Sequence, residues 1–410
     1  MRVLLINPTL GEAYGQERAM HQLGEELARQ GHKVFYLGEY IVGDFDPLGG
    51  YALVPGLSRS SWTDRSGKTP LRALLSTIQC VAPQIIHLHD ALEARLLRAL
   101  RRHYPTVFTA HTMAASCPAS TRLRKASVCQ SKAGLACLFA DLHDGCLSDF
   151  RNLARKVHAL ESYRRRDREL KQLPSIIAVS HYVADTLVQN GYAPERVTVV
   201  ENPIVVRAHA SAPAHVPLFV SASRLVKHKG IALALEAFAS IRDREWKYYI
   251  VGDGPEKGKL QKLSQSFGID ERVHFVPRLG QKQLHEFLCN ATAFLQTNIG
   301  PEPFGLTVSE ALAIGVPAIV AKLPCFDSRF ENMRGVRLVQ AGSTAALSLA
   351  LVEALEAKLV LPQIAKHSPN TIEVIEKIYQ QARSDFLSRP QKRIGALSIN
   401  GQSSLQVGGG

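Results

Sequence analysis

The chain has 410 residues, of which 46% are hydrophobic and 21% are charged, and it carries a formal net charge of +13 at pH 7. This length predicts two domains, this composition is typical of a soluble globular protein, and no apolar run approaches the ~18–20 residues that a membrane-spanning helix requires. The N-terminal stretch lacks the cleavage site of a signal peptide, so a cytoplasmic protein is expected. Seven cysteines, an odd number in a long chain, do not indicate the disulfide framework of a small secreted fold.

Short apolar runs alternate with stretches of helical periodicity along almost the whole chain. The first series of predicted strands covers residues 3–7, 33–38, 85–89, 106–111, 176–180 and 197–202. An Ala-, His- and Pro-containing linker is expected at 204–217. The second series covers residues 218–223, 247–252, 273–277, 293–298, 317–321 and 336–340. Nearly continuous apolar strands separated by helices predict an α/β protein with two doubly wound, Rossmann-like domains facing a cleft, and ligands bind beyond the carboxyl ends of such strands.

Two candidate positions lie in the first half of the chain. The first loop, NPTLGEAYGQERA, contains Gly11 and Gly15, which would let the backbone approach a phosphate or sugar, although it is not a G-x-G-x-x-G fingerprint. His111 ends the predicted strand at 106–111, where a ligand would bind. A lone histidine is more often structural than functional, so its position at a strand end favours a functional role for His111 only modestly.

A polar, basic segment follows His111. It contains four cysteines without a CxxC pair, so free thiols are favoured over a structural zinc site; the residues are Cys117, Cys129, Cys137 and Cys146. Between Arg98 and Lys171 lie 15 Lys and Arg residues against six Asp and Glu residues. This excess of positive charge has three interpretations: a solvated helix face, a surface for anionic lipid, or a nucleic-acid patch. Nucleic acid ranks last, because Tyr163 is the single aromatic ring in the densest part, 151–173.

The second half carries two fixed cations after its first strand. In SASRLVKHKG, Arg224 follows the strand and Lys229 directly precedes Gly230 and a predicted helix. Such cations can neutralise a diphosphate, and a guanidinium can bind it in a bidentate manner, although ordinary surface basicity explains them equally well. Further on, IVGDGPEKG matches a dinucleotide loop only weakly, so a plain strand–turn–helix is preferred to NAD binding.

The stretch PEPFGLTVSEALAIGVP places Glu302 in a loop and Glu310 inside the following helix. Gly315 and Pro317 are typical of the end of that helix. The free amides near Gly305 form an anion site, whereas the two carboxylates suit the hydroxyl donors of sugars. A nucleotide-sugar fits this arrangement, and a surface helix with two solvated glutamates is the alternative.

Together these motifs, in this order, resemble the family 4 retaining glycosyltransferases, which have the GT-B fold. The resemblance covers about residues 1–385 and rests on GQERAMHQLGEELARQGHKV, PQIIHLHD, FTAHT, SIIAVSHYVADTLVQNGY, VENP, SASRLVKHKG, YYIVGDGPEKGKL, RVHFVPRLG and PEPFGLTVSEALAIGVP. The chain departs from the family at Thr112, where an acidic residue is usual, at Pro277, where a glycine is usual, and at LPCFDSRFEN, where Gly-Gly and a glutamate are common.

The resemblance implies a role for each matching residue. Arg224 and Lys229 would bind the donor diphosphate, and Glu310 would bind the ribose. Glu302 would contact the donor sugar, and His111 would contact the same sugar from across the cleft. The remaining donor contacts would come from the backbone at Leu306 and Thr307, from Gly15, and, near the base, from Arg278 and Leu279.

The implied organisation has four parts: an acceptor-side domain (1–205), a nucleotide-sugar domain (206–370), a C-terminal helix (371–388) that packs back on the first domain, and a disordered tail (389–410). The implied reaction transfers a hexosyl or related group from a nucleotide-sugar to a sugar, lipid-linked or small-molecule acceptor, with retention and without metal or cofactor. The expected process is the synthesis of a cell-surface polysaccharide or glycolipid. The protein is expected to associate peripherally with the inner face of an anionic membrane. The alternatives are an epimerase or phosphorylase with a similar two-domain fold, a natural-product glycosyltransferase, a non-catalytic nucleotide-binding or interaction protein, and a dehydrogenase.

Overall fold

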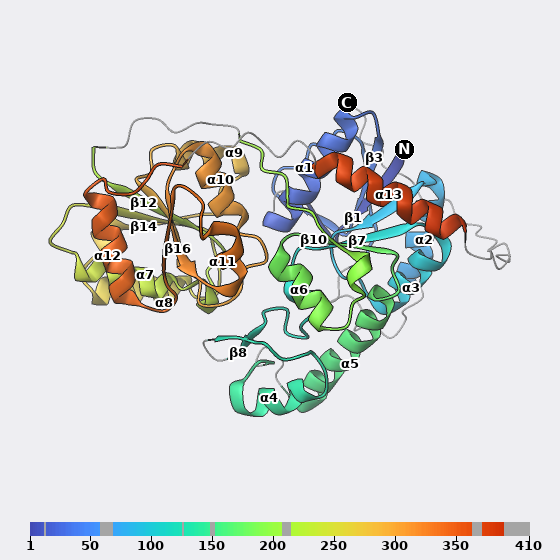
Figure 1. Cartoon of the computed structure of the whole chain (residues 1–410), viewed down its shortest axis with the longest axis horizontal. Helices are drawn as coiled ribbons and strands as arrows, with labels where there is room; N and C mark the ends of the chain where they lie inside the picture. Colours follow the sequence, from blue (N-terminus) through green and yellow to red (C-terminus); the bar gives the residue numbers. More distant parts are fainter. Residues whose placement is uncertain are drawn as a thin grey trace. The chain divides into compact units, whose positions relative to one another are not determined.

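The protein is described from a computed structural model, which places residues 1–11, 14–57, 69–124, 127–147, 152–206, 215–362 and 371–388. Within these ranges the chain forms two compact units (Figure 1). One contains residues 1–121, 131–203 and 371–388, and the other contains residues 122–130 and 204–362. The predicted tail (389–410) and most of the predicted linker (207–214) lie outside the described residues.

The first unit is built on a parallel sheet of seven strands in the order β11-β10-β7-β6-β1-β3-β5. These strands are β1 (Arg2–Ile6), β3 (Lys33–Gly38), β5 (Gly50–Leu53), β6 (Ile85–Leu88), β7 (Thr106–Ala110), β10 (Ser175–Ala178) and β11 (Val197–Val199). The helices are α1 (Gly15–Arg29), α2 (Thr69–Val81), α3 (Ala94–His103), α4 (Ala136–Asp144), α5 (Leu153–Leu170) and α6 (His181–Gln189). Strands β1, β6, β7 and β10 are buried along most of their length, so the centre of the sheet forms the core of this unit, while the edge strands β5 and β11 are partly exposed.

The second unit has a parallel sheet of six strands in the order β14-β13-β12-β15-β16-β17. The strands are β12 (Leu218–Ala222), β13 (Lys247–Val251), β14 (Val273–Val276), β15 (Ala293–Gln296), β16 (Ala318–Lys322) and β17 (Val336–Gln340). The helices are α7 (Ile231–Ser240), α8 (Lys257–Ser266), α9 (Gln281–Leu288), α10 (Leu306–Ile314), α11 (Pro324–Phe330) and α12 (Thr344–Leu355). Helices on both faces of a parallel sheet make each unit Rossmann-like, as predicted.

All twelve strands predicted from the apolar runs are present, and β3 and β17 have the predicted bounds. The strands that were not predicted are short: β2 (Thr9–Gly11), β4 (Tyr40–Val42), β5, β8 (Leu123–Arg124) and β9 (Ser127–Val128). β4 and β5 contain no buried residue, so their sequences lack the apolar run that marks the predicted strands. The β8–β9 hairpin belongs to the second unit, although its sequence neighbours belong to the first.

The C-terminal helix α13 (Thr371–Leu387) is part of the core of the first unit (Figure 1). Its apolar residues recur at helical spacing and share one hydrophobic cluster with strands β1, β6 and β7 and helix α1; they are Ile375, Ile378, Tyr379 and Ala382. None of the helices in the described part of the chain combines the length and the apolar character needed to cross a membrane.

Candidate active site

The second unit brings two predicted site residues into direct contact at the carboxyl ends of neighbouring strands. Lys229 ends the short 3-10 turn after β12, and Glu302 lies in the loop after β15. Nζ of Lys229 pairs with Oε2 of Glu302, and Asn298 donates a hydrogen bond of 3.2 Å to the same oxygen. Burial alone would raise the pKa of Glu302, but the charge and hydrogen bond of Lys229, helped by Asn298, leave it below its usual value. Glu302 is therefore an ionised, half-buried carboxylate.

The backbone after β12 and the backbone after β15 are bonded to each other, which fixes Lys229 beside Glu302. Oγ1 of Thr297 donates to the carbonyl of Lys229 (3.1 Å), and the amide of Ile299 donates to the carbonyl of His228 (2.9 Å). Gly230 adopts a φ of +69°, and a Cβ at this position would lie 1.9 Å from the Thr297 carbonyl oxygen. Both the conformation and the close approach therefore require glycine at 230.

Helix α10 contains Glu310 and ends at Gly315, as predicted. It begins after Gly305 (φ 77°) and ends at Gly315 (φ 108°), both left-handed. The bond from the amide of Ser309 to the carbonyl of Gly305 (3.0 Å) belongs to the first turn, so the amides of Leu306 and Thr307 precede the intrahelical ladder. This helix start, next to the Glu302 loop, has the chemistry of an anion site.

Glu310 lies inside α10 and is fully buried. Its Oε1 accepts a hydrogen bond from Nε2 of Gln281 (3.1 Å) and lies 3.6 Å from Nε2 of His285. Both partners belong to α9 and are themselves buried. The carboxylate is thus directed at α9, and its predicted contact with a ribose stays a prediction.

The other predicted donor contacts of this unit follow strand ends of the same sheet. Arg224 is exposed directly after β12, while Arg278 is exposed and Leu279 is half-buried after β14. Burial lowers the pKa of His228, and the charges of Lys229 and Arg224 lower it further. Arg224 and Lys229 both lie in the segment between β12 and α7.

The glycine-rich loop IVGDGPEKG serves backbone packing. A Cβ at Gly254 would lie 2.3 Å from the Leu225 carbonyl oxygen, and a Cβ at Gly252 would lie 2.0 Å from that of Ser223. The amide of Leu225 in turn donates to the carbonyl of Asp253 (2.8 Å). These contacts with the segment after β12 account for both glycines without a dinucleotide.

In the first unit, Gly15 begins α1 at the carboxyl end of β1. The amide of Tyr14 donates to Oε2 of Glu17 (3.1 Å), and Nε2 of Gln16 donates to Oδ1 of Asn7 (2.6 Å). Asn7 is buried at 1% exposure. A polar cluster therefore surrounds the helix start that contains Gly15.

His111 follows β7 and contacts a second histidine that sequence reasoning did not single out. Nε2 of His111 lies 2.8 Å from Nδ1 of His89, and the two rings stack with centroids 5.1 Å apart. His87 lies on the other side of His89, with ring centroids 4.2 Å apart. A signal was present in IIHLH, where two ionisable residues alternate with apolar ones in a buried strand.

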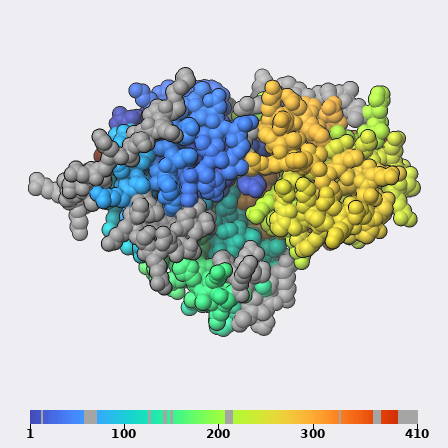
Figure 2. Space-filling model, turned by 180° about the vertical axis from the view of Figure 1, so that it is seen from behind, coloured from blue at the N-terminus to red at the C-terminus, as the bar shows by residue number. Residues whose placement is uncertain are grey.

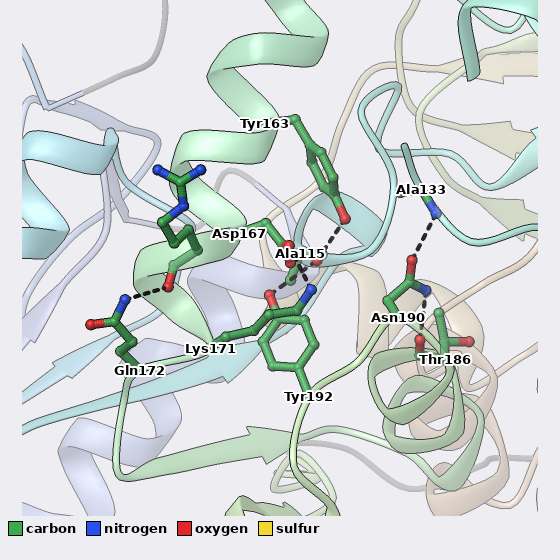
Figure 3. A network of polar contacts seen from close by, with 10 residues as sticks. Ala115, Ala133, Tyr163, Asp167, Lys171, Gln172, Thr186, Asn190 and Tyr192 are labelled. Atoms are coloured by element: carbon green, nitrogen blue, oxygen red, sulfur yellow. Dashed lines mark hydrogen bonds and ion pairs between the residues drawn. The ribbon is translucent and has the colours of Figure 1, made fainter. Parts of the chain in front are cut away.

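The basic segment forms α5, whose inner face is held by a polar network (Figure 3). The hydroxyls of Tyr163 and Tyr192 both donate to the carbonyl of Ala115 (3.4 and 3.1 Å), and Lys171 pairs with Asp167 (2.6 Å). Among the described residues, which include all four cysteines but not the side chain of His143, no group of three or more His, Cys, Asp or Glu residues could hold a metal ion, and the zinc alternative stays untested.

Two family models match the chain one after the other. Residues 13–207 match the model for glycosyltransferase family 4, and residues 207–373 match the model for glycosyl transferases group 1. Together they cover both units.

Among similar curated proteins, an O-antigen biosynthesis glycosyltransferase of Escherichia coli is 33% identical over 113 residues, which is 28% of this chain and 31% of that protein. The chain thus matches only about a third to a half of the length of the first curated relatives. Among solved structures, sucrose-phosphate synthase from Thermosynechococcus elongatus has a TM-score of 0.66 at 16% identity, covering 94% of both chains. The Anabaena protein HepE, solved with UDP-glucose, has a TM-score of 0.64 at 15% identity, covering 95% of this chain and 100% of that one.

Proposed function

Because this chain belongs to the family 4 glycosyltransferases and has the GT-B fold, we propose that it transfers a sugar from a nucleotide-diphosphate sugar to an acceptor hydroxyl. The observation that carries the proposal is the Lys229–Glu302 pair beside the start of α10. A cation and free helix amides suit a diphosphate, and a carboxylate suits sugar hydroxyls. The UDP-glucose in the structure of HepE, which shares the fold, agrees with a donor of this class.

In the proposed reaction, the bond between the anomeric carbon and the diphosphate oxygen breaks, and the acceptor oxygen forms a bond to the same face of that carbon. The acceptor proton passes to the leaving phosphate oxygen, so the anomeric configuration is retained and no protein base is required. Arg224, Lys229 and the dipole of α10 stabilise the negative charge that develops on the diphosphate. Metal independence follows from these protein charges and is part of the proposal.

The remaining donor contacts are assigned by the same reasoning. Glu302 accepts hydrogen bonds from the donor sugar, which His111 also contacts. Glu310 binds the ribose, and for this its carboxylate exchanges part of its contacts with Gln281 and His285 for the ribose hydroxyls. Leu306 and Thr307 give backbone amides to phosphate. Gly15 approaches the donor by its backbone, and the backbone near Arg278 and Leu279 holds the base.

Two variants and one control test this assignment. Lys229→Ala and Glu310→Ala are expected to abolish turnover and to weaken nucleotide binding at least tenfold, because each removes a charged contact with the donor. Lys259→Ala, an exposed lysine on α8, is the matched control and should behave as wild type. A thermal-shift panel of UDP-, GDP- and ADP-sugars identifies the donor first. Full activity of both site variants, or no stabilisation by any nucleotide, contradicts the proposal.

We further propose that the acceptor is a polysaccharide or glycolipid intermediate at an anionic membrane surface. The support is a surface on α4 and the start of α5, which we call the α4–α5 surface: it exposes Leu135, Phe139, Leu153 and Val157. Phe139 and Leu153 are 70% and 67% exposed, among the most exposed apolar residues of the described chain. In the space-filling view the green residues of this region lie at the molecular surface (Figure 2).

Positive charge accompanies these apolar side chains. The exposed cations of α5 are Arg155, Arg164, Arg165 and Arg168, of which Arg165 pairs with Glu161. The same helix is anchored by its inner face, where Glu169 is 2% exposed and accepts hydrogen bonds of 2.7 Å from Nε of Arg98 and of Arg101 in α3. A helix with exposed apolar and cationic side chains suits the interface of an anionic bilayer.

The epimerase alternative has its own test. Incubation of a nucleotide-sugar without acceptor would produce an epimer, and no observation favours this alternative.

A further inference from the structure

A row of three histidines runs along one face of the sheet in the first unit. Strands β6 and β7 are parallel neighbours, with His87 paired to Val107 in register. Residues two apart in a strand point to the same face, so His87 and His89 share a face, and His111 lies on that face two residues after Thr109. The ring stacking from His87 to His89 (4.2 Å) and from His89 to His111 (5.1 Å) follows from this register.

One end of the row is fixed by hydroxyl groups. Nδ1 of His87 lies 2.7 Å from the hydroxyl of Tyr379 in α13, and its Nε2 lies 2.6 Å from Oγ1 of Thr109. Both ring nitrogens of His87 are therefore satisfied, and its ring is fixed. His89 stacks against it with an interplanar angle of 34°. The packing of α13 on the sheet thus fixes one side of His89.

The other end of the row depends on a single hydrogen bond. His89 is 1% exposed, and its only hydrogen-bond partner among the described residues is His111, since Nε2 of His89 and Nδ1 of His111 are buried without one. A neutral imidazole has one donor and one acceptor nitrogen. Whichever ring donates in the 2.8 Å contact, the other must accept, so the tautomer of each ring determines that of the other.

We propose that His89 is a positioning residue, which holds the ring of His111 in one tautomer and one orientation. This inference rests on the proposed function only for the contact between the His111 ring and the donor sugar. If His89 donates, Nδ1 of His111 carries the proton of that ring; if His111 donates, Nδ1 is an acceptor. Without His89, the ring of His111 would lose the hydrogen bond to His89 and, with it, the preference for one tautomer.

The charged and titratable neighbours of His111 are few. His87 and His89 lie on the same face, and Asp90 is near enough for its negative charge to favour the protonated ring. Burial disfavours that form more strongly, so the pair stays neutral in the pH range of an activity assay.

The test compares His89→Leu, which keeps bulk without polar atoms, with His89→Asn, whose amide replaces Nδ1 as donor or acceptor. Side-chain 15N NMR of His111 should show one tautomer in the wild type and in His89→Asn, and a mixture in His89→Leu. We expect kcat to fall at least tenfold in His89→Leu, with a smaller change in KM, and to stay within about threefold in His89→Asn. Tyr379→Phe, which removes a buried bond at the far end of the row, is the control for general destabilisation and should leave the His111 spectrum unchanged.

Unchanged 15N shifts of His111 in His89→Leu overturn the proposal. Equal loss of kcat in His89→Leu and Tyr379→Phe also overturns it, because a merely structural role predicts that result. A tautomer mixture in His89→Leu together with a wild type that binds no nucleotide supports the positioning role and refutes the proposed function. The two inferences therefore fail separately.

Discussion

Lys229 and Glu302 are each other's partners in the structure, although the proposed reaction gives them different parts of the donor. A diphosphate that binds Lys229 therefore competes with the Glu302 carboxylate, and it also meets the negative charge of that carboxylate nearby. Asn298 donates a second hydrogen bond to the oxygen of Glu302 that pairs with Lys229. At the residue scale, this ion pair would couple recognition of the phosphate to recognition of the sugar in the proposed reaction.

The first prediction concerns this coupling. Glu302→Gln should bind a nucleoside diphosphate about fivefold to tenfold more tightly, because a negative charge is removed beside the anion site, while it loses sugar transfer. Isothermal titration with the diphosphate chosen by the thermal-shift panel measures the change. Glu373→Gln, on the exposed face of α13, serves as the control. Weaker binding by Glu302→Gln would mean that the carboxylate supports Lys229 more than it competes with phosphate.

The second prediction concerns the histidine row. Burial lowers the pKa of His87 to about 3 and that of His111 to about 4, whereas an unfolded histidine titrates near 6.5. As the pH falls below about 6.5, the unfolded chain takes up these protons first, so the free energy of unfolding decreases on acidification until the folded values are reached. His87→Gln should make this slope shallower by about 1.4 kcal/mol per pH unit between pH 6 and pH 4.5. Urea unfolding across that range provides the measurement, and a slope identical to that of the wild type would show that His87 is not held neutral.

Lys229 and Glu302 are placed by short connections between a strand and a helix. The turn after β12 and the loop after β15 fix Lys229 by backbone hydrogen bonds, and Gly230 is the position where they approach most closely. The start of α10 depends in the same way on Gly305, where a Cβ would lie 2.9 Å from the ring of Phe326. At the element scale, the site depends on left-handed glycines as much as on charged residues.

The third prediction separates conformational strain from close approach. Gly230 and Gly268 have similar φ values, +69° and +65°, but a Cβ at Gly268 meets nothing within 4 Å. Gly268→Ala should therefore cost about 1 kcal/mol of stability and leave nucleotide binding unchanged. Gly230→Ala should cost more and weaken nucleotide binding at least tenfold, because the Thr297 carbonyl must move and Lys229 moves with it. Equal behaviour of the two variants in a denaturation and binding comparison would contradict the close packing at Gly230.

For the molecule as a whole, catalysis on a membrane-linked acceptor would require a surface that brings the enzyme to the bilayer. The α4–α5 surface carries the apolar side chains for this role, and α5 carries the cations. The net charge of +13 favours anionic partners in general, and the segment from Arg98 to Lys171 contributes most of it.

The fourth prediction tests this surface. The wild type should sediment with vesicles that contain about one third phosphatidylglycerol but not with pure phosphatidylcholine vesicles, and added salt should weaken the binding. Phe139→Ser combined with Leu153→Ser should reduce binding at least tenfold, because two apolar side chains no longer enter the interface. Leu349→Ser on α12, where the leucine is 57% exposed, is the matched control. Equal binding of the double variant and the control would exclude the α4–α5 surface.

Two features of the whole chain were accessible to sequence reasoning, because both are local. Apolar runs of five or six residues identified twelve of the strands, and glycine with proline marked the end of α10. The motifs around Lys229 and Glu302 identified the family and the strand ends that carry the candidate site. These signals depend on hydrophobic period and turn chemistry, which a few consecutive residues determine.

Only the tertiary structure decided which side chains meet. Lys229 and Glu302 are 73 residues apart, Gln281 and Glu310 are 29 apart, and His89 and His111 are 22 apart. The register of neighbouring parallel strands and the packing of α9, α10 and α13 on their sheets create these contacts, and one residue of register shift would turn a side chain to the opposite face. The sequence by itself therefore determined the elements, the family and the candidate residues, while the partners that set the charge of Glu302 and the hydrogen bonding of His111 came from the packing of distant segments.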